Sequence, residues 1–147
     1  MHLIIVEDLS LDREKLADLI RRDCAGHGES ADLSFYDSGE DFLTRYRPKA
    51  CDGLFLDILL GGLSGIEVAR RVREREPRLP IIFTTAERDY AVEGFAVHAT
   101  DYLMKLAMQD HVFLVYGSAT GISGGAVLHF PTENPRVRPL RVGGCSF

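Results

Sequence analysis

The sequence predicts an α/β fold, a doubly wound parallel sheet with helices on both faces. Two observations support this prediction. Short apolar runs alternate with stretches of helical periodicity from the first residues to about Lys105, and this alternation is typical of a parallel sheet. Charged or hydroxyl-bearing residues also stand at the ends of several apolar runs, where buried strands should stop. A chain of 147 residues is one domain by length.

The apolar runs before Lys105 are the predicted strands. Most of them are continuously apolar, as expected for strands that are covered on both faces of a sheet. The second run contains Ser34 and is predicted to be less buried. The predicted strands are residues 3–6, 33–36, 53–56, 81–83 and 102–104.

The segments between these strands carry the start and stop signals of helices. Ser10 can cap the first helix, and Ser64 with Glu67 forms a capping-box pattern at the start of the third. Pro48 and Pro77 end the second and third helices, because proline interrupts the helical hydrogen bonds. The predicted helices are residues 10–24, a short helix from Ser38, a helix from Ser64 and residues 87–97. Their predicted inward stripes include Leu16, Leu19, Ile20 and Cys24 in the first helix and Ile66, Ala69 and Val72 in the third.

Polar side chains are predicted to gather at one edge of the sheet. Asp57 ends the third apolar run, Glu7 and Asp8 follow the first, Thr85 ends the fourth and Lys105 follows the fifth. In an open parallel sheet, ligands bind just outside the carboxyl ends of the strands. Three carboxylates, a hydroxyl and an ammonium that converge there indicate a metal-assisted site for phosphoryl transfer.

The span from Ile4 to Lys105 resembles the receiver domain of bacterial two-component response regulators. The residues that carry the resemblance are Glu7-Asp8, Asp57-Ile58 with residues 64–67 following, Thr85-Ala86 and residues 101–105. Five separate elements match in order and spacing. Residues 83–91 resemble the receivers that precede LytTR-type DNA-binding domains. The resemblance implies a flavodoxin-like, five-stranded sheet of order 2-1-3-4-5.

The resemblance also implies a phosphoacceptor and a Mg²⁺ site. Asp57 is the expected nucleophile, which forms an acyl phosphate. Asp8 and Asp57 are the best candidate direct ligands of Mg²⁺, which prefers oxygen donors and keeps several waters. Glu7 is longer and is expected to act through water, and the backbone carbonyl of Leu59 is the family's remaining protein ligand. Clustered carboxylates repel one another, so a divalent cation is needed before a phosphodonor can approach.

Three further residues have expected roles. Lys105 would pair with phosphate oxygens as a point charge. Thr85 would donate its hydroxyl, with the amide of Ala86, and would form a two-state switch with Tyr102. The expected partner is a histidine kinase, and the chain is expected to be a phosphoacceptor and not an enzyme.

Two positions depart from the family pattern. Gly61 stands where the loop after Asp57 usually carries proline, and glycine should loosen this loop. Leu106 stands where the family has a proline after the lysine, typically with a cis peptide bond. A cis bond without proline costs about 2.5–4 kcal/mol, so the Lys105-Leu106 bond is expected to be trans, which leaves the direction of the lysine open.

The resemblance implies a receiver domain over residues 1–106, and residues 107–147 are predicted to form an atypical extension with no separate output domain. The extension lacks the apolar stripe of the family's fifth helix, and residues 111–116 and 126–130 are predicted to form a β-hairpin in its place. Three competing explanations stay open for this pattern: a structural replacement, a shifted reading frame, or a strand-mediated assembly device. The hairpin would leave an apolar patch and a strand edge uncovered, so self-association is expected.

Composition restricts the classes of function. A net charge of −5 argues against a nucleic-acid-binding surface over the whole chain, and about 40 residues after Lys105 are too few for a DNA-binding output domain. Direct DNA binding is therefore not expected. No apolar stretch reaches the about 20 residues that span a membrane. A signal peptide is not expected, because the first predicted strand starts at residue 3. Cys24, Cys51 and Cys145 suggest neither a disulfide framework nor a metal site, and a cytoplasmic protein with reduced thiols is expected.

Two classes of function stay open from the sequence. The first is a phosphorylation-dependent switch, favoured by the five site residues. The second is a pseudo-receiver, a protein-interaction module or truncated regulator without phosphorylation-dependent switching, favoured by the break after Lys105. A metal-dependent phosphatase for external substrates is disfavoured, because no second catalytic acid stands near Asp57 beyond the metal pair.

Overall fold

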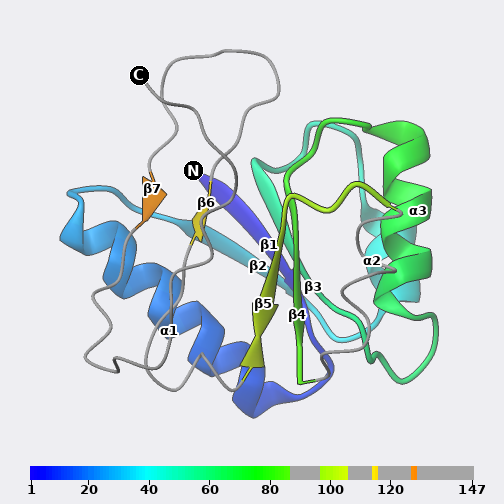
Figure 1. Ribbon diagram of the computed structural model, residues 1–147, viewed down its shortest axis with the longest axis horizontal. Helices are drawn as coiled ribbons and strands as arrows, with labels where there is room; N and C mark the ends of the chain where they lie inside the picture. Colours follow the sequence, from blue (N-terminus) through cyan, green and yellow to red (C-terminus); the bar gives the residue numbers. More distant parts are fainter. Residues whose placement is uncertain (87–96, 106–113, 116–126, 129–147) are drawn as a thin grey trace.

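A five-stranded parallel sheet forms the centre of the protein (Figure 1). The computed structural model describes residues 1–86, 97–105, 114–115 and 127–128. The sheet strands are β1 (His2–Val6), β2 (Asp32–Tyr36), β3 (Gly53–Asp57), β4 (Ile81–Thr85) and β5 (Asp101–Met104). The predicted parallel α/β architecture is confirmed. The order of the first four strands is β2-β1-β3-β4, as the resemblance implied, and β5 pairs with β4.

Helices cover both faces of the sheet. Successive strand residues point to opposite sides, and in β3 and β4 the residues on both sides are buried. Helix α1 (Ser10–Gly26) packs on the face that carries Ile5, Phe55 and Ile82. Helices α2 (Gly39–Arg45) and α3 (Gly65–Arg75) lie on the other face, as Figure 1 shows. The predicted inward stripes of α1 and α3 are confirmed as buried: Leu16, Leu19, Ile20, Cys24, Ile66, Ala69 and Val72.

The helix starts agree with the sequence at two of three positions. The hydroxyl of Ser38 accepts a hydrogen bond from the amide of Asp41 at 3.1 Å, and Ser64 caps α3 in the same way. The predicted cap at Ser10 is wrong. The amide of Arg13 donates to the carbonyl of Leu9 at 3.0 Å, so the helix begins one residue earlier and Ser10 is already its first helical residue.

Two contacts fix the ends of α3, one to strand β3 and the other to the segments that lead into β4 and β5. At its start, a Cβ at Gly65 would overlap the carbonyl oxygen of Asp57, so only glycine permits this close approach. Near its end, the half-buried guanidinium of Arg73 donates to the carbonyls of Val97 (3.1 Å) and Leu79 (2.6 Å). It also donates to the carbonyls of His98 (2.9 Å) and Glu76 (3.4 Å). The segment that enters β5 is thereby attached to α3.

Part of the predicted C-terminal hairpin is described. Strands β6 (Leu114–Val115) and β7 (Val127–Leu128) pair antiparallel and fall inside the two strands predicted from the sequence. The rest of the extension lies outside the described residues. Residues 87–96 of the predicted fourth helix also lie outside them. The replacement of a fifth helix, the division at residue 106 and self-association therefore stay predictions.

The remaining expectations from composition concern thiols and membranes. Cys24 and Cys51 are free and buried, as expected for reduced thiols, and Cys145 lies outside the described part of the chain. Among the helices in the described ranges, none combines the length and apolar character needed to cross a membrane.

Candidate functional site at the carboxyl edge of the sheet

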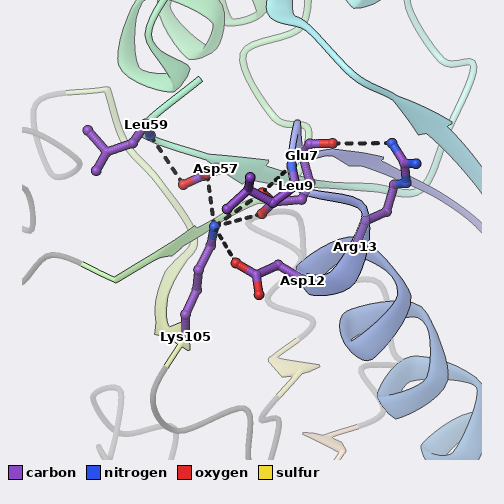
Figure 2. A network of polar contacts seen from close by, with 7 residues as sticks. All are labelled: Glu7, Leu9, Asp12, Arg13, Asp57, Leu59 and Lys105. Carbon is purple, nitrogen blue, oxygen red and sulfur yellow. Dashed lines mark hydrogen bonds and ion pairs between the residues drawn. The ribbon is translucent and has the colours of Figure 1, made fainter. Parts of the chain in front are cut away.

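Asp57 is the last residue of β3, which lies between strands β1 and β4 in the sheet. Its side chain is nearly inaccessible, and its two oxygens have different partners (Figure 2). Oδ1 accepts a hydrogen bond from the amide of Leu59 at 3.2 Å. Oδ2 accepts one from the ammonium of Lys105 at 2.9 Å. The carboxylate is thus held between a backbone donor and a cation.

Glu7 and Asp8 follow β1, the strand beside β3. Glu7 is buried, whereas Asp8 is exposed. The amide of Leu9 donates to Oε1 of Glu7 at 3.2 Å. One carboxylate oxygen from each of Glu7, Asp8 and Asp57 lies within 4.8 Å of the others. The structure therefore brings together the three carboxylates that the sequence predicted to converge.

Lys105 reaches this cluster from the end of β5. Its Nζ lies 2.9 Å from Oε2 of Glu7 and 2.9 Å from Oδ2 of Asp57. The lysine therefore points into the site although Leu106 stands in place of the family's proline. The peptide bond between Lys105 and Leu106 lies outside the described residues.

Asp12 is a fourth carboxylate at the site, which sequence reasoning missed. Its Oδ2 lies 3.1 Å from Nζ of Lys105. Asp12 lies in the first turn of α1, where a carboxylate is favoured by the helix dipole alone, so its residue type did not mark it as a site residue. The available signal was its position four residues after Asp8, at the start of the helix that the sequence already predicted.

The site has an excess of negative charge. Burial raises the pKa of Glu7 to about 7, the hydrogen bond from Lys105 opposes this shift, and the charge of Asp57 adds to it. For Lys105, burial acts to lower the pKa, but the hydrogen bonds to Asp57 and Glu7 outweigh burial and raise it. Carboxylate oxygens this close together match the donors that Mg²⁺ prefers, and a cation would relieve their repulsion. The residues present therefore fit a divalent ion.

The remaining predicted site residues lie on β4, β5 and the loop after Asp57. Thr85 is fully buried at the end of β4, and its neighbour Thr84 is paired in register with Asp57. The backbone of Tyr102 is paired in register with Phe83 of β4, and its side chain lies outside the described part of the structure. The roles predicted for Thr85, Tyr102, the amide of Ala86 and the carbonyl of Leu59 stay predictions. The effect predicted for Gly61 also stays one.

Comparisons with known proteins agree with this geometry. Residues 3–115 match the response regulator receiver domain family. The sensory transduction protein LytT of Oceanobacillus iheyensis is 36% identical over 107 residues, which are 71% of this chain and 42% of that protein. LytT of Enterococcus faecalis is 31% identical over 145 residues, which are 98% of this chain and 58% of that protein.

A solved structure agrees as well. The crystal structure of the response regulatory domain of MrkE from Klebsiella pneumoniae superimposes with a TM-score of 0.63 at 32% identity, covering 71% of this chain and 83% of that one. The chain spans about half the length of the curated relatives it matches. With the family matched over most of its length and the parallel sheet with its acidic edge in place, the chain belongs to the response regulator receiver domains of two-component systems.

Proposed function

We propose that the protein is a phosphoacceptor, which takes a phosphoryl group from a histidine kinase onto Asp57 in a Mg²⁺-dependent reaction. One observation carries the proposal. The Asp57 carboxylate lies within 4.8 Å of two further carboxylates and 2.9 Å from the ammonium of Lys105, at the carboxyl edge of the sheet. This arrangement combines a nucleophile, a set of oxygen donors for a cation and a positive charge for phosphate oxygens.

The residues that would hold the ion are Asp8 and Asp57 directly, Glu7 through water, and the backbone carbonyl of Leu59. When bound, Mg²⁺ supplies positive charge that offsets the carboxylates and the incoming phosphoryl oxygens. The exposure of Asp8 supports this assignment, because Mg²⁺ keeps several waters and needs a side of the site that is open to solvent. Glu7, by contrast, is buried and forms the inner wall of the cluster.

The chain's own groups position the transfer. An oxygen of Asp57 forms a bond to phosphorus while the bond from phosphorus to the donor nitrogen of phosphohistidine breaks, and the departing imidazole keeps that electron pair. Lys105 pairs with the phosphoryl oxygens as a point charge. The Thr85 hydroxyl and the Ala86 amide donate further hydrogen bonds. Movement of Thr85 toward the phosphoryl group then opens space for Tyr102, which couples the site to the surface.

The output is proposed to be protein contact and not catalysis or direct DNA binding by this chain. The names of the LytT relatives support a LytTR-type receiver in sensory transduction. Misalignment of Lys105 by the missing proline would favour the alternative of a pseudo-receiver, but Nζ of Lys105 lies 2.9 Å from Oδ2 of Asp57 without that proline.

The test is Mg²⁺-dependent labelling with a small acyl-phosphate donor, read by intact mass. The wild-type protein should gain one phosphoryl group, Asp57→Asn should gain none, and Asp8→Asn should lose the dependence on Mg²⁺. Asp18→Asn is the matched control, because it makes the same change on an exposed part of α1 that pairs with Arg21. A phosphoadduct that persists in Asp57→Asn would sink the assignment.

A further inference from the structure

The ammonium of Lys105 is shared among three carboxylates. Lysine has three N–H donors and no acceptor. Its Nζ lies 2.9 Å from Glu7 Oε2, 2.9 Å from Asp57 Oδ2 and 3.1 Å from Asp12 Oδ2. One carboxylate is therefore available to each donor, and the side chain of the lysine is only 12% exposed.

Asp12 differs from the other two carboxylates in place and in chemistry. It comes from α1 and not from a strand end, and its side chain is 26% exposed, against 2% for Glu7 and 3% for Asp57. It does not belong to the group of three whose oxygens lie within 4.8 Å of one another. In the view of Figure 2, Asp12 and Asp57 lie on opposite sides of the ammonium.

These differences matter once a cation is bound. A divalent ion held by Glu7, Asp8 and Asp57 would take two of the carboxylates that Lys105 now uses, and it would repel the ammonium. Asp12 would then be the carboxylate that Lys105 keeps, because it stands outside the group of three.

We propose that Asp12 is a positioning residue, which holds the ammonium of Lys105 at the mouth of the site when a divalent cation occupies the carboxylates of Glu7, Asp8 and Asp57. The inference rests on the proposed Mg²⁺ site and adds a residue to it. Asp12 touches neither the phosphorus nor the ion. It acts through Lys105, which it keeps close to Asp57 instead of free in solvent.

The test is competitive acetylation of lysine amines, read for each residue by mass spectrometry. The chain has three lysines, and the exposed Lys15 and Lys49 serve as internal references for Lys105. In the wild-type protein, Lys105 should stay protected with and without saturating Mg²⁺. In Asp12→Asn, it should stay protected without Mg²⁺, because Glu7 and Asp57 still hold it, and should become several-fold more reactive when Mg²⁺ is added.

Two variants and one binding measurement make the outcomes distinct. Asp12→Glu should restore protection, and Asp18→Asn, the same change farther along α1, should behave as wild type. Titration calorimetry with Mg²⁺ alone establishes saturation for each protein. Binding of Mg²⁺ with Lys105 equally protected in Asp12→Asn overturns this inference and leaves the proposed function standing. Exposure of Lys105 by Mg²⁺ in the wild type also overturns it. Absence of Mg²⁺ binding to the wild type overturns both.

Discussion

Arg73 allows a quantitative test of how α3 holds the segment before β5. The four hydrogen bonds described for its guanidinium go to backbone carbonyls, and two of these belong to the buried residues Val97 and Leu79. Arg73→Met keeps much of the apolar stem and removes the donors. We therefore expect this substitution to remove the attachment while leaving the packing of α3 largely unchanged.

The magnitude follows from the carbonyls left behind. A buried acceptor without a partner costs about 1–3 kcal/mol. Two such carbonyls give a loss of about 4 kcal/mol in the free energy of unfolding, with a smaller contribution from the more exposed carbonyl of His98. A domain of this size is stable by about 5–15 kcal/mol, so the variant should retain its fold with a clearly lowered denaturation midpoint.

The assay is urea denaturation followed by circular dichroism. Arg70→Met is the matched control, because Arg70 lies on the same helix, is 57% exposed and pairs with Glu67 at 3.4 Å. It should change the free energy of unfolding by less than about 0.5 kcal/mol. Equal, small effects of the two substitutions would refute the reasoning, because Arg73 would then stabilise no more than a surface arginine.

Three further predictions concern the polar groups of the fold and site. Glu7→Gln should stabilise the protein without metal by up to about 3 kcal/mol at about pH 8 and little at about pH 5, as measured by urea denaturation. The pKa of Glu7 is raised from 4.5 to about 7 in the folded protein. The wild-type protein therefore loses stability as pH rises from about 4.5 through about 7, whereas the glutamine variant stays neutral and does not. Tyr46→Phe should lower the denaturation free energy by about 1–3 kcal/mol, because the buried Tyr46 hydroxyl donates to the carboxylate of Glu76. Thr85→Ala should leave phosphorylation largely intact while uncoupling it from changes around Tyr102. NMR shifts near Tyr102 that respond to phosphorylation as in the wild type would contradict the switch.

The sequence predicts the sheet and its acidic edge well, for a physical reason. Strand runs and the residues that end them are local features, and parallel strands bring their carboxyl ends to one edge without further information. Glu7, Asp8 and Asp57 therefore converge as predicted. The capping serines of α2 and α3 are local signals too.

The features that sequence reasoning missed depend on contacts between distant segments. Asp12 meets Lys105 only after β5 is placed in the sheet, and either residue alone resembles an ordinary surface charge. Arg73 contacts backbone carbonyls, which every residue carries, so its partners leave no mark in the sequence. Ser10 shows the limit of a local signal, since the helix starts one residue earlier than its cap-forming side chain indicates.

The contact between Gly65 and Asp57 has a mechanical consequence. The first residue of α3 rests directly on the backbone of the carboxylate-bearing residue, with no room for even a methyl group between them. A shift of the Asp57 backbone should therefore displace the start of α3 as well. Near its other end, α3 is hydrogen-bonded through Arg73 to the segment before β5, so this segment should move with the helix. A spin label on the outer side of α3 would then report a change at Asp57 as a displacement of the helix, without being attached near the carboxylates of the site.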